Sequence, residues 1–248
     1  MGLFSGLFTK KEKLGPADLS VLKVDMHSHL IPGIDDGSKS LDDTIAMLAK
    51  FKDLGYSKVI TTPHIMSDFY KNTPETILGG LEIVREEIKR IGLDIEIEAA
   101  AEYFYDETFV ARLANDDFLT FGKDKHVLIE FAFTSEPIGY DAFFFDMLMK
   151  DYKPIIAHFE RYMFLHGSID KAREWREKGV LIQLNLNSLS GHYGPSVKKQ
   201  AELLVDSGQI DFIASDCHRI DHLNQIENLL TSEYLHKVLE LPLKNKFL

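Results

Sequence analysis

The sequence predicts an α/β protein in which parallel strands close into a barrel. Short apolar runs, most of them rich in Val and Ile, recur seven times along the chain, as is typical of buried parallel strands. Segments with helical spacing of apolar residues separate these runs. Regular alternation of strand and helix implies right-handed crossovers and therefore a parallel sheet.

The apolar runs of the predicted strands are the clearest signal in the sequence. These strands are predicted at residues 21–26, 57–62, 95–101, 126–131, 153–157, 179–187 and 210–215.

Two of the predicted helices carry clear end signals. The helix at 41–54 follows Ser40, a residue type that caps helix N-termini, and ends at Gly55, a typical C-cap. The helix at 75–91 begins after a Thr-Pro pair and ends before a glycine. Further helices are predicted at residues 106–116, 140–151, 169–178, 196–207 and 222–239.

A doubly wound open sheet and a closed barrel both satisfy this order of elements. An open sheet concentrates functional residues at one switch point, whereas a barrel collects them at the carboxyl ends of nearly all strands. Six of the seven predicted strands end at a His, Asp or Glu. This distribution favours the barrel.

Length and composition predict one large domain over residues 21–248, with residues 1–20 as an N-terminal appendage. Hydrophobic residues make up 45% of the chain and charged residues 27%, as in ordinary globular proteins. The net charge of −11 argues against nonspecific nucleic-acid binding through a basic surface. The single cysteine, Cys217, excludes an intrachain disulfide and favours a reducing, cytoplasmic compartment.

The first residues do not match the usual targeting signals. Their apolar stretch is short and lacks a small-residue cleavage site, and position 6 is Gly where the myristoylation pattern has Ser or Thr. The sequence has no run of 18 apolar residues that would predict a transmembrane helix. We therefore expect a cytoplasmic protein that associates with a membrane only through a partner.

Histidine and acidic residues at the predicted strand ends indicate a metal site. His27 and His29 follow the first strand, and alternation along an extended chain points both imidazoles to one side. Asp216 and His218 repeat this spacing after the last strand. Glu130 lies within an apolar run, where a carboxylate needs a cation or a hydrogen-bond network. The other candidates are His64, Glu102 and His158, and the loop Asp35-Asp36-Gly37 can bring a further carboxylate to the same strand end.

Each candidate taken alone has a simpler interpretation. A single histidine after a strand, such as His64, is more often a core or surface residue than a ligand. Their joint occurrence at the same end of successive strands favours a metal centre.

Specific motifs follow one another between about residues 21 and 218: VDMHSHLIPGIDDG, TTPH, AAAEYFY, LIEF, IAHFERY and IASDCH. In this order they resemble the PHP (polymerase and histidinol phosphatase) superfamily. More narrowly, they resemble the bacterial manganese-dependent protein-tyrosine phosphatases of capsular and extracellular polysaccharide synthesis. The resemblance implies a distorted TIM-like (β/α)7 barrel with three divalent metal ions at the C-terminal ends of the strands.

The resemblance also implies a ligand set for each ion. The first ion would use His27, His29, Glu102 and Asp216; the second Glu102, Glu130 and His158; the third Asp36, His64 and His218. Manganese is the implied metal, and mixed nitrogen and oxygen ligands also suit iron or zinc, with magnesium as a further alternative. Three divalent ions outweigh the charge of the four carboxylates, so this acidic protein can offer an anion-binding pocket.

Arg161 is the predicted catalytic and substrate-binding residue, because its planar guanidinium can hold two phosphate oxygens. Its alternative role is a salt bridge to a nearby carboxylate. The family has a second functional arginine in a proline-containing loop after ASDxH, but this chain reads RIDHLNQIENL there. Arg219 is the predicted substitute in substrate binding, with the role of His222 left open. This difference from the family pattern affects the expected specificity for phosphotyrosine more than the expected phosphatase chemistry.

A cysteine-dependent phosphatase mechanism does not fit the sequence. That mechanism needs an arginine six positions after the cysteine, and Leu223 stands there after Cys217. We expect Cys217 to pack behind the metal ligands.

The sequence thus predicts a metal-dependent phosphatase that hydrolyses phosphotyrosine on a protein by attack of a metal-bound hydroxide. The expected partner is a bacterial tyrosine kinase of polysaccharide export. Two alternatives stay open: a small-molecule phosphatase such as histidinol phosphatase, and a metal-binding regulatory module with little turnover. Nucleic acid is not an expected substrate, because no basic stripe is visible. Metal identity, physiological substrate and oligomeric state stay open as well.

Overall fold

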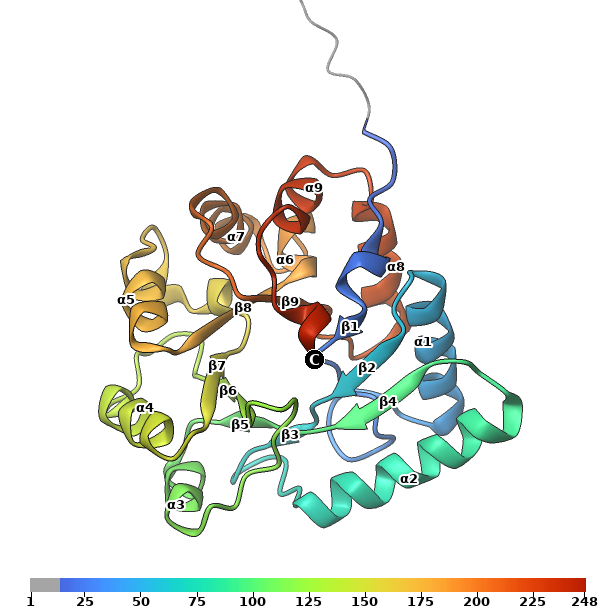
Figure 1. Cartoon of the computed structure of the whole chain (residues 1–248), viewed down its shortest axis with the longest axis horizontal. Helices are drawn as coiled ribbons and strands as arrows, with labels where there is room; N and C mark the ends of the chain where they lie inside the picture. The colour runs from blue at the N-terminus through green and yellow to red at the C-terminus, as the bar shows by residue number, and fades with distance from the viewer. Residues whose placement is uncertain (1–13) are drawn as a thin grey trace, which may run out of the picture.

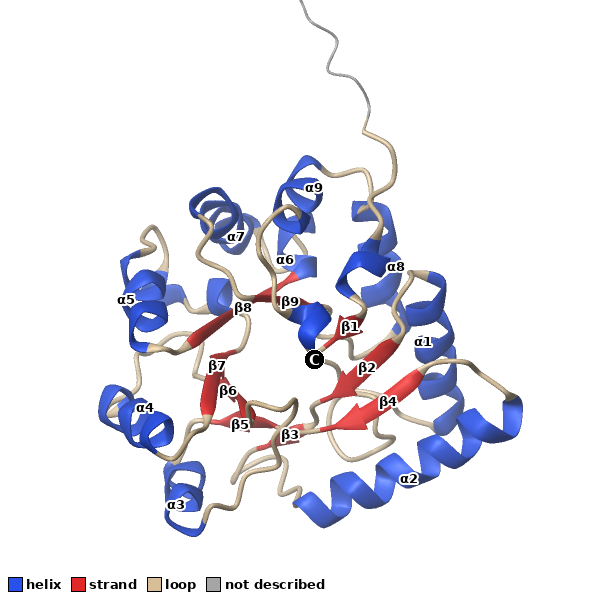
Figure 2. Ribbon diagram, in the orientation of Figure 1, coloured by secondary structure: helices blue, strands red, loops and turns tan. Residues whose placement is uncertain are grey.

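A ring of parallel strands surrounded by helices forms the centre of the computed structural model, which describes residues 14–248 (Figures 1 and 2). The strands are β1 (Val24–Asp25), β2 (Lys58–Thr61), β3 (His64–Ile65), β4 (Glu96–Ala99), β5 (Glu102–Phe104), β6 (His126–Glu130), β7 (Lys153–Ile156), β8 (Leu181–Asn185) and β9 (Phe212–Ala214). Their neighbours in space are β1-β2-β4 and β3-β5-β6-β7-β8-β9, and every pairing is parallel.

Two of the predicted strands, 57–62 and 95–101, are each followed after a short break by a further strand that was not predicted. Pro63, which lacks an amide hydrogen, separates β2 from β3, and two alanines separate β4 from β5. Pairing continues across the breaks, since the Glu102 amide donates to the Pro63 carbonyl at 3.1 Å. The ring closes where the His29 amide donates to the Cys217 carbonyl at 2.8 Å. With β2 and β3 counted together, and β4 and β5 counted together, seven strands form the ring. The predicted (β/α) barrel is confirmed.

Helices connect the strands and lie outside them (Figure 2). They are α1 (Leu41–Asp53), α2 (Pro74–Ile91), α3 (Glu107–Asn115), α4 (Tyr140–Met149), α5 (Asp170–Lys178), α6 (Leu186–Ser190), α7 (Pro195–Ser207), α8 (Ile220–Leu229) and α9 (Glu233–Leu239). Short 3-10 helices are η1 (Leu19–Leu22), η2 (Phe159–Arg161), η3 (Met163–Leu165) and η4 (Asn245–Phe247). As predicted, the Ser40 side chain caps α1 by accepting from the Asp43 amide at 3.1 Å.

Three predicted boundaries are wrong. The strand predicted at 21–26 begins later, because Asp18 caps η1 and this turn extends to Leu22. The strand predicted at 179–187 ends at Asn185, whose side chain accepts from the Asn187 amide and so starts α6. The helix predicted at 222–239 is split into α8 and α9, because Ser232 has an extended backbone.

The interior of the barrel is apolar, and the C-terminus covers its amino end. Val24, Ile60, Leu128 and other strand side chains form the interior cluster, and Leu248 packs against it. The Asn245 side chain donates to the carbonyl oxygen of Val24 at 3.1 Å. Figure 1 shows the C-terminus at the centre of the ring. The opposite, carboxyl end of the strands is therefore the end that presents the predicted site.

The described part of the predicted appendage contacts the barrel domain. Residues 1–13 lie outside the described residues. The Ala17 amide donates to the Leu230 carbonyl at 2.7 Å, and Leu19 is buried. Within residues 14–248, no helix is both long and apolar enough to cross a membrane.

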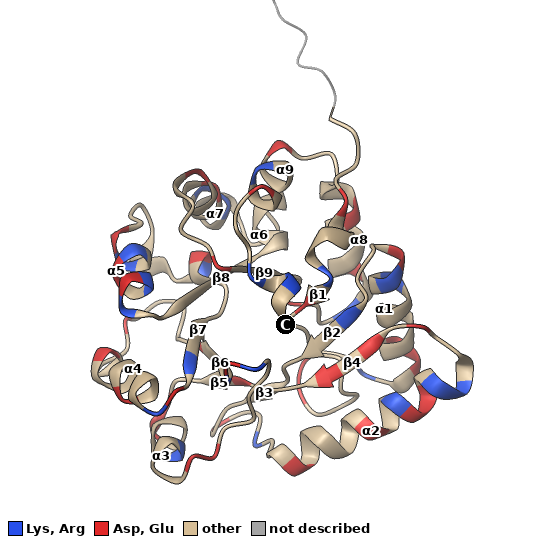
Figure 3. Ribbon diagram, viewed as in Figure 1, with Lys and Arg blue, Asp and Glu red and all other residues tan. Residues whose placement is uncertain are grey.

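Acidic and basic residues are mixed over the outer helices. Figure 3 shows both charges on α2 and on α5. Several of them form pairs one turn apart, such as Arg85 with Glu82 at 2.8 Å and Arg90 with Glu87. Solvent screens such exposed pairs, so they contribute little to the stability of the fold.

Candidate metal centre

All nine predicted metal ligands lie together at the carboxyl end of the barrel. Their possible ligand atoms form four overlapping groups, and within each group the atoms lie within 4.8 Å of one another. The groups are His29, Asp36, His64 and His218; His27, His29 and Asp216; His27, Glu102 and His158; and His64, Glu102 and Glu130.

Glu102 lies at the centre of the cluster and is fully buried. Its Oε2 atom lies 3.2 Å from His27 Nε2 and 3.1 Å from His64 Nδ1. The same oxygen is 3.4 Å from His29 Nε2, and Oε1 is 3.0 Å from His158 Nε2. Among the described residues, no hydrogen-bond donor reaches Oε2. A buried carboxylate oxygen facing several imidazole nitrogens without a donor fits a divalent cation between them.

The orientation of His27 and His29 is set by remote side chains. Gln183 Oε1 accepts from His27 Nδ1 at 3.1 Å, and Asp35 Oδ2 accepts from His29 Nδ1 at 2.8 Å. Gln183 Oε1 also accepts from the His158 amide at 2.8 Å, which fixes the amide orientation. The two Nε2 atoms are therefore left with lone pairs only 3.3 Å apart. Two lone pairs that converge in this way suit a bound cation.

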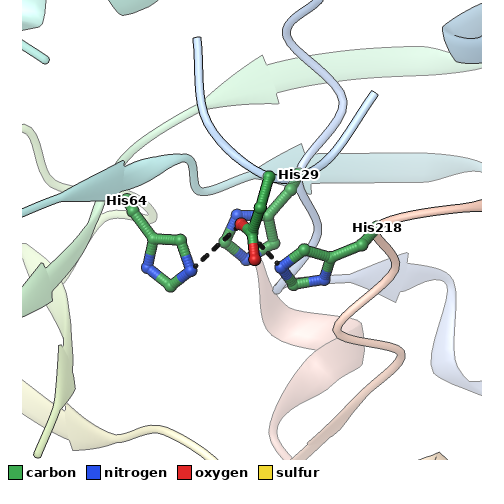
Figure 4. A group of neighbouring side chains, drawn as sticks. His29, His64 and His218 are labelled. Carbon is green, nitrogen blue, oxygen red and sulfur yellow. Dashed lines mark ion pairs between the residues drawn. The ribbon is translucent and has the colours of Figure 1, made fainter. Parts of the chain in front are cut away.

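Asp36 and two histidines form the outer side of the cluster. Asp36 Oδ1 lies 3.3 Å from His218 Nε2 and 3.6 Å from His64 Nε2. Figure 4 shows the rings of His29, His64 and His218 gathered around this carboxylate, and its dashed lines mark the two ion pairs. The Asp36 side chain is 51% exposed, so this side of the cluster opens to solvent.

The loop that carries Asp36 lies against the first strand because of Gly37. A Cβ atom at Gly37 would overlap with the carbonyl oxygen and the Cβ of His29. The Asp35 carboxylate accepts from the Gly37 amide at 3.0 Å and from the His64 amide at 3.1 Å. The DDG sequence thus supplies one candidate ligand, one residue that orients a histidine, and the glycine that allows the close approach.

Asp216 and His158 adopt left-handed backbone conformations, with φ of 50° and 30°. Non-glycine residues in this region cost about 1–3 kcal/mol and persist where surrounding contacts hold them. Asp216 Oδ2 accepts from Asn185 Nδ2 at 2.8 Å and from Arg161 Nη1 at 3.1 Å. Its Oδ1 atom lies 3.4 Å from His27 Nε2, so the carboxylate connects the cluster to the arginine.

The cluster holds more negative charge than its protein neighbours balance. Burial and the adjacent Glu102 carboxylate raise the pKa of Glu130 well above its ordinary value. Burial would also raise the pKa of Glu102, but the charges of His27 and His64 hold that pKa well below its usual range. Burial, together with the Arg161 charge, lowers the pKa of His158 to about 4, so its ring is neutral near pH 7. Neutral imidazoles beside crowded carboxylates are suited to bind cations.

Arg161 lies at the edge of the cluster between two aromatic rings. Its guanidinium carbon is 4.3 Å from the Phe133 ring centre and 4.4 Å from the Tyr193 ring centre. The salt bridge considered as an alternative is present, since Nη1 pairs with Asp216 Oδ2 at 3.1 Å. Arg161 also lines the cavity above the cluster, so the salt bridge and the substrate role are compatible.

The cavity above the cluster has a volume of about 380 Å³. Its polar lining includes Arg219 and His222, and the His222 Nε2 atom is buried with no hydrogen-bond partner among the described residues. Its apolar and aromatic lining includes Met66, Tyr70, Phe104, Phe131 and Phe133.

Sequence reasoning missed the side chains that orient the ligands. Gln183 and Asn185 project from β8, and Tyr193 follows α6. A signal for the first two was present, because LIQLNLN places polar residues at every second position of an otherwise apolar run. Alternation predicts that these side chains share a face, but the face itself emerges only from the barrel.

Cys217 points away from the cluster. The residue is buried, and its Sγ atom lies 3.5 Å from Met47 Sδ. Burial raises the pKa of the Cys217 thiol well above its ordinary value, so it is not a nucleophilic thiolate near pH 7. The expectation that it packs behind the metal ligands is confirmed by this contact.

Known relatives share both the sequence and the fold. The tyrosine-protein phosphatase YwqE of Bacillus subtilis (strain 168) is 30% identical over 213 residues, covering 86% of this chain and 82% of YwqE. The tyrosine-protein phosphatase CpsB of Streptococcus pneumoniae is 27% identical over 220 residues, covering 85% of this chain and 90% of CpsB. A crystal structure from work on YwqE and CpsB, described as unique metal-dependent tyrosine phosphatases, gives a TM-score of 0.75 at 25% identity. That alignment covers 89% of this chain and 96% of the other.

The model of one protein family matches most of the chain. This family is Capsular polysaccharide synthesis, CpsB/CapC, and the match extends over residues 23–238. It spans the strands from β1 to β9, which carry or precede every candidate ligand. The chain therefore belongs to the CpsB/CapC family of capsular polysaccharide synthesis.

Proposed function

We propose that residues 21–248 form a metal-dependent phosphatase domain that hydrolyses phosphotyrosine in proteins. The observation that carries this proposal is the cluster of nine His, Asp and Glu residues beneath a cavity that Arg161 also lines. The names of the relatives YwqE and CpsB support the same reaction.

Three divalent ions are proposed for the cluster, with Glu102 shared between the first two. The proposed ligand sets are His27, His29, Glu102 and Asp216; Glu102, Glu130 and His158; and Asp36, His64 and His218. The proximity groups support this division only in part, because His64 also groups with Glu102 and Glu130, and His29 also groups with Asp36, His64 and His218. Manganese is the proposed metal, with iron, zinc and magnesium as the alternatives to test. When bound, such ions lower the pKa of coordinated water and neutralise phosphate charge.

Arg161 is the proposed catalytic residue outside the ligand set. Its stacking between Phe133 and Tyr193 holds the guanidinium plane in place, so its free N–H groups are already oriented toward the cavity. A guanidinium that is positioned in this way donates two hydrogen bonds to a phosphate. Arg219 contributes a second positive charge at the mouth of the same cavity.

The aromatic lining of the cavity suits the ring of a tyrosyl group. Tyr70 stacks on His64 with ring centres 5.4 Å apart and planes 13° apart, which fixes its position at the edge of the site. Phe104, Phe131 and Met66 extend the apolar lining. An aryl phosphate therefore meets cations at its phosphate and aromatic contacts at its ring.

The proposed protein substrate is a phosphorylated tyrosine kinase of polysaccharide export. The family description, capsular polysaccharide synthesis, supports this pathway. We place the enzyme in the cytoplasm, where contact with such a kinase would bring it to the membrane.

The test combines metal analysis with a substrate panel. Metal-free protein is loaded separately with manganese, iron, zinc or magnesium, and turnover of a phosphotyrosine peptide is compared with that of histidinol phosphate. We expect three ions per chain, preference for the phosphotyrosine peptide, and complete loss of activity with a chelator. Faster turnover of histidinol phosphate would assign the small-molecule reaction instead, and full metal content without turnover would assign a regulatory module.

A matched pair of variants tests the role of Glu102. Glu102→Gln keeps the side-chain volume but removes the charge at the centre of the cluster, so we expect loss of bound metal and of activity. Glu96→Gln changes the same residue type on β4, where the side chain is 62% exposed, and is the control. Equal metal content in the two variants would refute the proposed ligand assignment.

A further inference from the structure

A second cavity lies directly beside the metal centre. Its volume is about 460 Å³, and it lies where the loop before α1 meets the start of α8. These two helices are neighbours on the outside of the barrel (Figure 1). Asp36, His218 and Arg219 line both this cavity and the cavity above the cluster. A chain that binds in the first cavity therefore has a direct path into the second.

The second cavity combines apolar side chains with free cations. Ala46, Met47 and Ile220 contribute the apolar lining, and Lys39 and Arg219 contribute the positive charges. Neither cation has an ion pair within residues 14–248, although many other lysines and arginines of this acidic protein do. Their donors are therefore available to a ligand.

Two cations and two carboxylates line the second cavity, but Asp36 belongs to the proposed third ligand set, where it lies 3.3 Å from His218 and 3.6 Å from His64. Asp43 is the remaining carboxylate, and it lies in the first turn of α1, where the helix dipole offsets part of its charge. Lys39 and Arg219 therefore outweigh the free negative charge.

A third cavity, on the opposite flank of the metal centre, has a different chemistry. It measures about 300 Å³ and is lined by Lys71, Arg112 and Asp106 among other residues. Arg112 is already paired with Asp117 at 2.7 Å, and the Asp106 carboxylate is directed into this region by the amides of Ser67 and Phe109. Arg112 is thus compensated, and Lys71 is the one cation of this cavity without an ion pair within residues 14–248, whereas the second cavity has two such cations.

We propose that the second cavity binds an acidic side chain next to the phosphotyrosine of the protein substrate. This inference rests on the proposed phosphatase function. The methylene groups of a glutamate would pack on Met47 and Ile220, and its carboxylate would meet Lys39 and Arg219. Consecutive residues of an extended chain are about 3.3–3.6 Å apart, so a residue one or two positions from the phosphotyrosine can reach an adjoining cavity. A phosphorylated neighbouring residue presents the same anionic chemistry.

The experiment compares phosphotyrosine peptides that differ only in the residues flanking the phosphotyrosine. These residues are Glu, Gln, Lys or phosphoserine, and p-nitrophenyl phosphate serves as a substrate without flanking residues. For the manganese-loaded wild type we expect kcat/KM for the Glu peptide to be about three- to fivefold above that for the Gln peptide, as for one exposed ion pair. The difference is expected in KM and to disappear in about 1 M salt.

Lys39→Glu is the informative variant, because Lys39 lies outside the proposed catalytic and ligand residues. We expect it to abolish or invert the preference for Glu and to leave p-nitrophenyl phosphate turnover unchanged. Lys199→Glu, an equal charge change at an exposed position of α7, is the control and retains the preference. A stronger preference for phosphoserine than for Glu would identify a phosphate as the bound anion, and the reverse order a carboxylate.

Three results would overturn the inference, and they differ in whether the proposed function fails as well. If Glu and Gln peptides are turned over equally while p-nitrophenyl phosphate is hydrolysed at full rate, the acidic subsite is wrong and the proposed function stands. If no phosphotyrosine substrate is turned over by fully metal-loaded protein, both fail. Equal loss of preference in Lys39→Glu and Lys199→Glu would also overturn it, because the effect would then be one of net charge.

Discussion

Replacing Arg161 by lysine keeps the positive charge but removes the flat guanidinium between the Phe133 and Tyr193 rings. In the structure those rings lie 4.3 and 4.4 Å from the guanidinium carbon, and Nη1 donates to Asp216 at 3.1 Å. A lysine ammonium has no plane to stack and no second arm, so it can satisfy either Asp216 or the phosphate.

The expected size of the effect follows from the contact that is lost. One charge-assisted hydrogen bond to the phosphate is worth about 1.5–3 kcal/mol, which corresponds to a loss of about 10- to 150-fold in kcat/KM. The Arg161 side chain is 22% exposed, so solvent weakens the contact and the lower part of this range is expected. Because the contact strengthens as charge develops on the transferred phosphoryl group, most of the loss should be in kcat.

The assay is steady-state hydrolysis of p-nitrophenyl phosphate by wild type and Arg161→Lys, each with its metal content measured. Arg219→Lys is the comparison, because Arg219 is exposed and has no ion pair within residues 14–248; a loss below about fivefold is expected there. Activity of Arg161→Lys within threefold of wild type at full metal content would falsify the role given to the stacked guanidinium. Loss of metal would show instead that Arg161 acts through Asp216.

Three further predictions concern the thiol, the DDG loop and the amino end of the barrel. Cys217→Ser should retain activity within about threefold. It should lower the free energy of unfolding by about 1–3 kcal/mol, because a buried hydroxyl group replaces a thiol. A large loss of kcat with the metals still bound would contradict this prediction. Gly37→Ala should lower activity at least tenfold, because the added methyl group displaces the loop that carries Asp36. Gly79→Ala, on the exposed face of α2, is the control and should leave activity unchanged. Similar kinetics for the two variants would refute the steric argument. Burial lowers the pKa of His126 in the folded protein. The unfolded chain therefore binds more protons than the folded protein as the pH falls below about 6.5, and the free energy of unfolding decreases as the pH falls. Urea midpoints at pH 7.5 and 5.5 should therefore differ more for wild type than for His126→Asn.

Much of the fold could be predicted because its signals are local. Helix α1 begins after Ser40 and α2 after Thr73, as their capping patterns predict, since a cap depends on residues three positions apart. The split between α8 and α9 was missed. Leu229 and Leu235 are both buried but lie six positions apart, a spacing that one face of a continuous helix does not give, so the sequence held a signal for the break at Ser232.

The candidate site was likewise predictable where its signals are local and not where they depend on tertiary contacts. Residue type and strand ends were sufficient to nominate eight of the nine candidate ligands, because the strands of a parallel barrel all end at one face, and the family resemblance added Asp36. The break between β2 and β3 at Pro63 was also readable, and it brings His64 into register with Glu102. The residues that orient the ligands were not nominated, because a polar side chain on a strand has many possible partners until the barrel closes.

The sequence by itself therefore determined which residues are the candidates for the chemistry and at which end of the barrel they lie, because both follow from residue type and from the order of strands and helices. Only the tertiary structure decided which imidazole nitrogen faces the cluster. Gln183 is 156 positions from His27, yet its amide oxygen accepts from Nδ1 and leaves Nε2 directed at Glu102. Tertiary contacts also place Arg161 between the Phe133 and Tyr193 rings, and they bring Lys39 and Arg219 together in the second cavity. Such contacts join remote segments, and no local pattern encodes a distance between segments that meet only when the chain folds.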